Sequence, residues 1–286
     1  MKLQKLSALL CAMLIVSPAV AAAQQNIGGS HTRAEKLVWS DEFNGSHLDP
    51  GKWIAVNNDS GYGNNELEYY TSRAVNVKQR KGELLLTARR EKYTGKDGQT
   101  RLYTSGRIET RGRFQLKYGR IEARIKMPKG QGIWSAFWML GSDYARVGWP
   151  NCGELDIMEN VGFEPSKVHG SLHGPGYSGS NPLTGAYTLP GGKRFSDGYH
   201  VFSADWSPHA IRFYVDGVLY ETQTAKDVPA GHRWVFNHPF YIILNVAVGG
   251  FWPGNPDATT KFPQTMRVDY VRVYQLANDP AGKGKN

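Results

Sequence analysis

Long apolar segments, cysteines and regular helical patterns are all scarce in this sequence of 286 residues. Residues 6–16 form an apolar run that is too short to span a bilayer, and no later segment reaches about 18 apolar residues. No amphipathic pattern lasts three helical turns after residue 30. These absences exclude later membrane-spanning helices and argue against a fold built on long helices.

The first 23 residues have the pattern of a secretory signal peptide. Lys2 and Lys5 provide a basic start, the apolar run follows, and residues 19–23 offer the small side chains of a cleavage site. A membrane anchor is the alternative interpretation. We expect residues 1–23 to be removed, giving a secreted or periplasmic protein that has no membrane partner.

Cleavage after Ala23 would leave Cys152 as the only cysteine, because Cys11 lies within the removed segment. The mature chain would then have no internal disulfide, so burial of apolar side chains must supply its stability. Cys152 stands two residues before Glu154, but a catalytic thiol needs a nearby histidine and some exposure. A small buried side chain is the favoured interpretation of Cys152.

Positive charge is in excess, with a formal net charge of +9 at pH 7. Such an excess can indicate nucleic acid or an anionic polymer as a partner. Here, however, Arg120, Glu122, Arg124 and Lys126 alternate with apolar residues, which is typical of a solvated sheet face. No nucleic-acid-binding motif is present, so we expect no nucleic-acid partner.

Short alternating runs separated by turn residues recur through the chain, which has 33 Gly and 15 Pro. Residues 104–114 and 118–127 are expected strands. The nearly continuous apolar run 240–248 predicts a central strand that is buried on both faces. Residues 174–198, rich in Gly, Ser and Pro, predict a single long functional loop.

This pattern predicts an all-β sandwich, a class that often fills this length as one domain. We place that domain at residues 37–276. Residues 24–36 are expected to be a flexible lead-in, and residues 277–286 a disordered polar tail. No internal repeat or second domain is evident.

One segment, Glu154-Leu155-Asp156-Ile157-Met158-Glu159, concentrates carboxylates among apolar residues. On a regular strand, Glu154 and Asp156 point the same way, but Glu159 is five residues from Glu154 and would face the core. Burying an ionised glutamate without a partner costs several kcal/mol. We therefore predict a β-bulge near Ile157 and Met158 that returns Glu159 to the face of the other two.

Three carboxylates on one face suit either a divalent cation or cleavage of a glycosidic bond. Trp134 and Trp138 favour the second, because both would lie on one face of a strand and offer platforms for sugar rings, although core packing is the alternative. His169 and His173 have the spacing of a helical zinc pair, but the neighbouring glycines make a helix, and hence a zinc site, improbable.

The chain resembles glycoside hydrolase family sixteen, and within it the bacterial laminarinases, which are endo-β-1,3-glucanases. The carboxylate segment is similar to the bulged form of the family signature. Further similarity lies, in order, at residues 39–45, 63–67, 69–71, 130–134, 136–141, 148–150, 173–177, 244–250 and 268–274. Departures from the family pattern are small: Tyr62 and Glu68 stand where Trp and Gln are common, and Ser135 where Pro is common.

The resemblance implies a β-jelly-roll of two curved antiparallel sheets with the substrate on the concave face. It implies a retaining double displacement in which Glu154 is the nucleophile, Asp156 orients and tunes it, and Glu159 is the acid/base. No cofactor is expected for catalysis, and a monomer is expected. The partner is a β-glucan polysaccharide.

The resemblance also implies a set of substrate-binding residues and a structural calcium. The expected binding residues are Asn65, Arg107, Trp134, Trp138, Trp149, His173 and Asn245. The calcium would be bound by the Asp269 carboxylate and the backbone carbonyls of Glu42 and Gly82. The alternative is that Asp269 pairs with a nearby arginine.

Three other readings of the function stay open at this point. A non-catalytic β-glucan-binding protein of the same fold would be expected to lack the carboxylates, and this chain keeps all three. Mixed-linkage β-1,3-1,4-glucan or an algal galactan are alternative substrates. Transfer to a sugar instead of to water is an alternative reaction.

Overall fold

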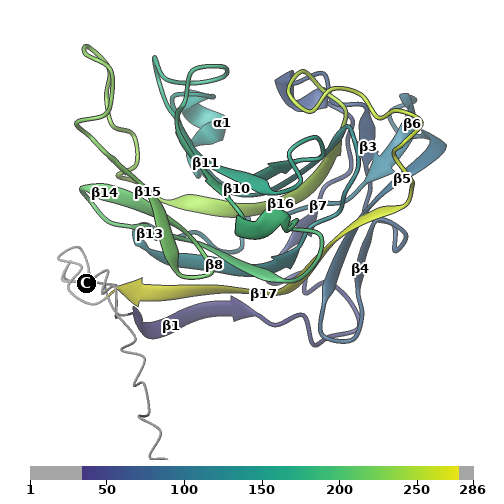
Figure 1. Cartoon of the computed structure of the whole chain (residues 1–286), viewed down its shortest axis with the longest axis horizontal. Coiled ribbons are helices and arrows are strands. Elements are labelled where there is room, and N and C mark those ends of the chain that lie inside the picture. The colour runs from purple at the N-terminus through teal and green to yellow at the C-terminus, as the bar shows by residue number, and fades with distance from the viewer. Residues whose placement is uncertain (1–33, 277–286) are drawn as a thin grey trace, which may run out of the picture. The chain divides into compact units, whose positions relative to one another are not determined.

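Two stacked β-sheets make up the computed structural model, which describes residues 34–276 (Figure 1). The signal peptide expected at residues 1–23, most of the expected lead-in and the expected tail at residues 277–286 lie outside the described residues. No helix among the described residues has the length and apolar character needed to cross a membrane.

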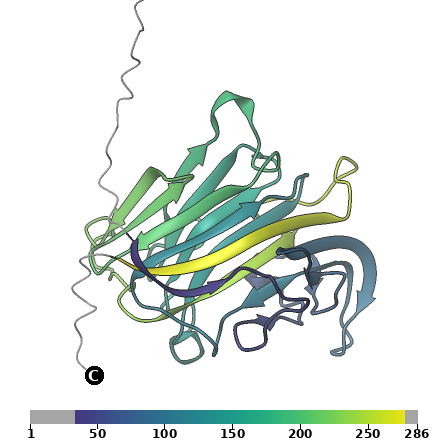
Figure 2. The same cartoon turned by 90° about the horizontal axis from the view of Figure 1, so that it is seen from below.

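The larger sheet has ten strands, all paired antiparallel except β3 with β6. Its main path, in spatial order, is β15 (Val218–Thr224), β14 (Ala210–Val215), β13 (His200–Trp206), β8 (Gly119–Lys126), β17 (Gln264–Leu276), β5 (Leu84–Thr94), β6 (Thr100–Ser105) and β3 (Glu68–Tyr70). In addition, β1 (Ala34–Asp41) pairs with β17, and β4 (Val77–Gln79) pairs with β5. Figure 2 shows β17 crossing this sheet next to β1.

The smaller sheet has seven antiparallel strands and contains the carboxylate segment in β10. Its spatial order is β12 (Leu183–Thr188), β11 (Lys167–His173), β10 (Glu154–Val161), β9 (Ile133–Gly141), β16 (Phe240–Val248), β7 (Arg107–Glu109) and β2 (Ile54–Ala55). Only short helical turns occur in the described chain: η1 (Gly61–Gly63), α1 (Tyr144–Val147) and η2 (Pro190–Gly192). We call the face of the smaller sheet that turns away from the larger sheet the open face.

Apolar side chains from both sheets form the core between them. In β8, Ile121, Ala123 and Ile125 are fully buried, whereas the residues that alternate with them are only partly so. All nine residues of β16 are buried, as predicted for a central strand. The β-jelly-roll sandwich predicted from the sequence is therefore confirmed.

The expected strand at residues 104–114 is wrong in its extent. The chain breaks at Gly106, so that β6 belongs to the larger sheet and β7 to the smaller one. A Cβ atom added at Gly106 would lie 2.6 Å from the backbone oxygen of Asn76, so the crossing between sheets needs a residue without a side chain. An alternating pattern cannot show such a change of sheet.

Two further boundaries differ from the sequence predictions. Residues 174–198 are not one loop, because they contain β12, an edge strand that pairs with β11 and alternates between partly and fully exposed side chains. The first strand, β1, already includes Ala34, which pairs with Leu276, and does not start at Leu37. Residues 34–36 therefore belong to the sandwich and not to the lead-in.

Candidate active site

The predicted β-bulge lies in β10 and is confirmed. Asp156 pairs with Trp138 of β9, but the next paired residue, Met158, is opposite Phe137. Ile157 is therefore the extra residue. Ile157 and Met158 both point into the core, where they are almost completely buried. With two successive side chains directed inward, Glu159 returns to the open face that carries Glu154 and Asp156.

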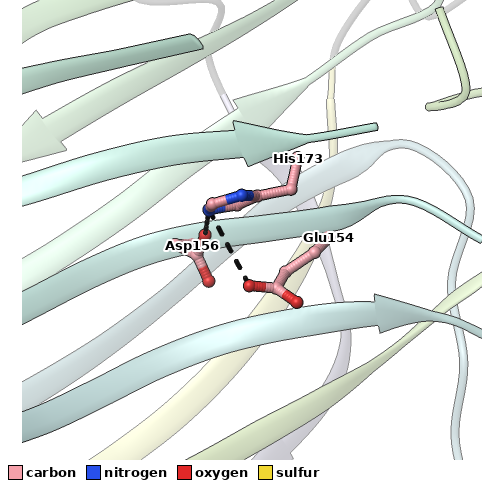
Figure 3. A group of neighbouring side chains, drawn as sticks. All are labelled: Glu154, Asp156 and His173. Carbon is pink, nitrogen blue, oxygen red and sulfur yellow. Dashed lines mark ion pairs between the residues drawn. The ribbon is translucent and has the colours of Figure 1, made fainter. Parts of the chain in front are cut away.

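Glu154, Asp156 and His173 form a compact cluster on adjacent strands (Figure 3). His173 of β11 is directly opposite Glu154 of β10. Its Nε2 atom lies 3.2 Å from Asp156 Oδ2 and 3.9 Å from Glu154 Oε1. The contact with Asp156 lacks the alignment of a hydrogen bond, since Asp156 Oδ2 has no hydrogen-bond partner among the described residues.

The loop after β11 favours one tautomer of a neutral His173 ring. The backbone N–H of Gly179 donates to His173 Nδ1 at 3.2 Å, so this nitrogen acts as an acceptor. In a neutral imidazole the other nitrogen then carries the proton. His173 therefore presents an Nε2–H group to the carboxyls of Asp156 and Glu154.

Burial raises the pKa values of all three carboxyl groups. Burial and the charge of Asp156 raise the pKa of Glu154 to about 8. Burial raises the pKa of Asp156 to about 8, although its hydrogen bond with Glu154 opposes this. Burial, and then the charge of Asp156, hold the pKa of Glu159 well above its usual range. The site therefore retains protons at a pH where ordinary carboxyl groups are ionised.

Glu154 and Glu159 form hydrogen bonds with different tryptophans. The Trp149 indole forms a hydrogen bond with Glu154, and Arg107 also lowers the pKa of Glu154 through its charge. Glu159 accepts one hydrogen bond, 3.1 Å long, from Trp134 Nε1. Both tryptophans keep part of their surface exposed, Trp149 at 44%. They are thus available as platforms at the site.

Trp138, Asn245 and Arg107, which the resemblance led us to expect as substrate-binding residues, contact one another beside Asp156. Trp138 Nε1 donates to Asn245 Oδ1 at 2.7 Å. The Arg107 guanidinium lies over the Trp138 ring, 5.0 Å from its centroid. An ion pair of 2.9 Å with Glu109 holds Arg107 in place. In β9 only Trp134 and Trp138 escape full burial, so their rings are not core side chains.

Asn65 and His169 take other places. Asn65 is exposed on the loop before β3 with a positive φ of 58°, and no hydrogen bond or ion pair in residues 34–276 joins it to the three carboxylates. His169 is opposite Glu159 in the strand pairing, but its Nε2 atom lies 2.8 Å from Glu164. His169 thus contacts Glu164, whereas His173 contacts Asp156 and Glu154.

Trp252 and the Gly179 backbone were not identified as site groups from the sequence, and Tyr62 was noted only as a departure from the family pattern. Trp252 packs edge-on against the rings of Trp134, at 5.4 Å, and His169, at 5.2 Å. Tyr62 covers the other side of Arg107, with the guanidinium 4.1 Å from its ring centroid. A tryptophan in a Gly- and Pro-rich loop was the available signal for Trp252. No sequence signal identifies the backbone of Gly179.

The residues expected to bind calcium lie on the larger sheet and nearby loops. Asp269 Oδ2 forms an ion pair of 2.7 Å with Arg124, which is the alternative considered from the sequence. The Glu42 side chain pairs with Arg272 at 2.8 Å, leaving its backbone carbonyl as the expected ligand. A calcium ion would have to share the Asp269 carboxylate with Arg124. The calcium site stays a prediction.

The cluster in Figure 3 also has a geometry that suits a metal ion. One ligand atom each from Glu154, Asp156 and His173 lie within 4.8 Å of one another. The same three groups supply what acid–base and nucleophilic chemistry at a sugar needs: a carboxylate, a neighbouring acid and a fixed N–H donor.

Residues 64–272 match the family model described as glycosyl hydrolases family 16. A protein named beta-glucanase from Rhodothermus marinus is 43% identical over 256 residues, covering 84% of this chain and 85% of that protein. The endo-1,3-beta-glucanase catalytic domain from Thermotoga petrophila has a TM-score of 0.82 and 47% identity, covering 86% of this chain and 100% of that one.

An endo-beta-1,3-glucanase structure from Pyrococcus furiosus has a TM-score of 0.82 and 52% identity. The match covers 85% of this chain and 95% of that one. Sequence and fold thus agree over most of the described residues, including every strand around the carboxylate segment. The chain belongs to glycosyl hydrolase family 16.

Proposed function

We propose that the protein is an endo-acting β-1,3-glucanase that hydrolyses laminarin-type glucans. The observation that carries this proposal is the bulge in β10, which places Glu154, Asp156 and Glu159 on one face beside three partly exposed tryptophans. Relatives with this fold and 43–52% identity are named as glucanases, which supports the same substrate class. The retained carboxylates argue against a purely binding role.

In the proposed reaction Glu154 attacks the anomeric carbon and forms a glycosyl ester. Glu159 gives its proton to the departing glycosidic oxygen, so the bond to the leaving sugar breaks without forming an alkoxide. Glu159 then takes a proton from water, which attacks the same carbon and releases Glu154. Retention needs the two carboxyl groups about 5–5.5 Å apart.

Asp156 keeps the nucleophile ready for this attack. The hydrogen bond between the carboxyls of Asp156 and Glu154 requires one proton, so the pair carries at most one negative charge. The hydrogen bond lowers the pKa of Asp156 and the charge of Asp156 raises that of Glu154, so the shared proton lies on Glu154 in the free enzyme. In the proposed attack this proton moves to Asp156, which makes Glu154 the carboxylate. The single negative charge of the pair keeps Glu159 protonated, and ester formation removes that charge so that Glu159 becomes a base.

The substrate is held by stacking and by hydrogen bonds. The faces of Trp134, Trp138 and Trp149 are platforms for sugar rings, while Asn245 and Arg107 hold the Trp138 ring. The His173 ring lies beside the acidic pair, with Nε2 3.2 Å from Asp156 Oδ2.

The experiment that tests the function compares release of reducing ends from laminarin, curdlan, lichenan and agarose. We expect the highest rate on laminarin, with internal cleavage seen as a rapid fall in chain length. Hydrolysis of agarose alone would contradict the glucanase proposal. Proton NMR of the first product should show the β-anomer, and an α-anomer would contradict retention.

We further propose that the enzyme is exported and acts as a monomer. The predicted signal peptide supports export, and the monomer is supported by the origin of Glu154, Asp156, Glu159 and His173 in one chain. Sequencing the N-terminus of the exported protein should locate cleavage after Ala23. Light scattering of the purified enzyme should give the mass of one chain.

A further inference from the structure

A second pair of carboxyl groups is buried beside the site, at the start of β3. Glu66 is 6% exposed and Glu68 is 1% exposed. No ion pair reaches either glutamate anywhere in residues 34–276, and Arg107 pairs with Glu109 instead. Two adjacent buried carboxylates without a cation would repel each other strongly, so the pair cannot be doubly ionised.

Hydrogen bonds show which of the two carboxyls carries the proton. Glu66 Oε1 accepts from Asn64 Nδ2 at 3.1 Å, and Glu66 Oε2 accepts from the Tyr70 hydroxyl at 3.3 Å. Glu68 Oε2 accepts from the Val248 N–H at 2.7 Å. The two carboxyls also form a hydrogen bond with each other, which requires a proton. Both Glu66 oxygens accept side-chain hydrogen bonds, and the bond between the two carboxyls raises the pKa of Glu68, which identifies Glu68 as the donor.

The same hydrogen bonds continue to Asn245 and Trp138. The Tyr70 hydroxyl, which donates to Glu66, accepts from Asn245 Nδ2 at 3.1 Å. Asn245 Oδ1 in turn accepts from Trp138 Nε1 at 2.7 Å. Trp138 is directly opposite Asp156 in the β9–β10 pairing. Every donor in this series points toward Glu66, which therefore fixes the orientation of the Trp138 ring.

We propose that Glu68 remains protonated at neutral pH, donates to Glu66, and so acts as a positioning residue for the Trp138 platform. Burial and the charge of Glu66 hold the pKa of Glu68 well above its usual range. The other charged or titratable groups that face the pair are Tyr70 and, beyond it, Arg107 and Tyr62. None of them removes the need for the proton.

The proton itself is tested by infrared spectroscopy, which does not depend on the proposed function. The difference spectrum between the wild type and Glu68→Gln at about pH 7 should contain the C=O band of a protonated carboxylic acid in the wild type. Carboxylate bands in its place would overturn the proposal. Glu221→Gln is the control, because Glu221 is a buried acid on β15 outside the site. Its difference spectrum against the wild type gives the bands of a different buried glutamate.

The positioning role is tested by KM for laminarin, and this arm rests on the proposed function. Glu68→Gln keeps a donor toward Glu66, so its KM should stay within about twofold of the wild type. Glu66→Gln places a side-chain N–H group opposite groups that themselves donate hydrogen bonds. The KM of this variant should therefore rise about tenfold, with a smaller change in kcat.

Equal increases in KM for the two variants would overturn the positioning role, as would a change in KM for Glu221→Gln. If Glu66→Gln does not fold, Tyr70→Phe interrupts the same series and should raise KM in its place. Failure of the enzyme to cleave laminarin would refute the proposed function but would leave the infrared result intact.

Discussion

The indole N–H of Trp134 donates to Oε1 of Glu159, 3.1 Å away, and this bond distinguishes the two oxygens of that carboxyl. An indole nitrogen can only donate, so Oε1 must accept. In the proposed reaction Oε2 is therefore the oxygen that would carry the proton given to the glycosidic oxygen.

Trp134→Phe should keep the platform and remove this donor. The hydrogen bond from Trp134 lowers the pKa of Glu159, so its loss should raise that pKa. The alkaline limb of the kcat/KM profile reports the acid in the free enzyme and should move to higher pH, with a loss of about tenfold at the optimum. Trp138→Phe is the control, because its N–H binds Asn245; an equal movement of the limb there would contradict the assignment.

Glu154→Gln and Glu159→Gln should each lower kcat on laminarin by at least about 100-fold. The two roles separate on an aryl β-glucoside whose leaving group needs no protonation. Glu159→Gln should form the glycosyl ester on that substrate at a rate close to that of the wild type, while Glu154→Gln should not react. Circular dichroism checks that both variants fold, and the reverse pattern of reactivity would exchange the two roles.

Deleting Ile157 should remove the bulge without turning Glu159 inward. Glu154 and Glu159 are opposite Leu140 and Ala136 of β9, which are four residues apart, so four residues of β10 are enough to span them. We expect a loss of about 2–5 kcal/mol in the free energy of unfolding from the missing core side chain, but measurable activity.

Deletion of Leu155 is the matched control, because it removes another fully buried aliphatic side chain of β10. That deletion leaves Glu154 and Asp156 adjacent and therefore on opposite faces. A folded but inactive protein is the expected result. If both deletion variants fold and are equally active, activity does not require the three carboxylates to share one face, and the prediction is wrong.

The raised pKa values predict how stability depends on pH. The folded-state pKa of Glu154, about 8, exceeds the usual value of 4.5, so the folded protein keeps a proton that the unfolded chain releases. This contribution is fully present below pH 4.5 and is lost as the pH rises toward about 8. The Tm of Glu154→Gln relative to the wild type should therefore increase between about pH 5 and pH 8.

Glu42→Gln is a control for which the Tm difference from the wild type should depend on pH in the opposite direction. The hydrogen bond from Arg272 lowers the pKa of Glu42, so its contribution is present above pH 4.5 and lost as the pH falls. The Tm deficit of this variant should shrink in acid. A Tm difference for Glu154→Gln that does not vary with pH would refute the shift at the active site.

Calcium at Asp269 would raise the Tm in a concentration-dependent way, and chelation would reverse the gain. Asp269→Asn should abolish the response. Asp216→Asn, which changes another surface carboxylate in an ion pair, should retain it. A Tm that is unaffected by calcium would leave the pair between Asp269 and Arg124 as the role of that carboxylate.

Periodic sequence patterns made much of this fold predictable. Features that depend on contacts between residues far apart in the sequence were not predictable. The alternation in β8 and the apolar run of β16 were sufficient to place those strands. The five-residue spacing of Glu154 and Glu159 predicted the bulge. The change of sheet at Gly106 was not predictable, because it depends on the Asn76 backbone, which lies in another segment.

The site followed the same rule. The three carboxylates are near one another in the sequence, so their shared face could be inferred from strand geometry. The bond between Tyr70 and Asn245 joins residues 175 positions apart, and no local pattern encodes it. Trp252 was missed for the same reason, since only packing places a loop residue against Trp134.

The position of β17 has a consequence for how the chain folds during its synthesis. This last strand lies inside the larger sheet, between β8 and β5, and also holds β1. During synthesis the first 263 residues therefore lack the strand that joins the two halves of that sheet. We expect a nascent chain to remain incompletely folded, and accessible to chaperones and export machinery, until Leu276 has left the ribosome.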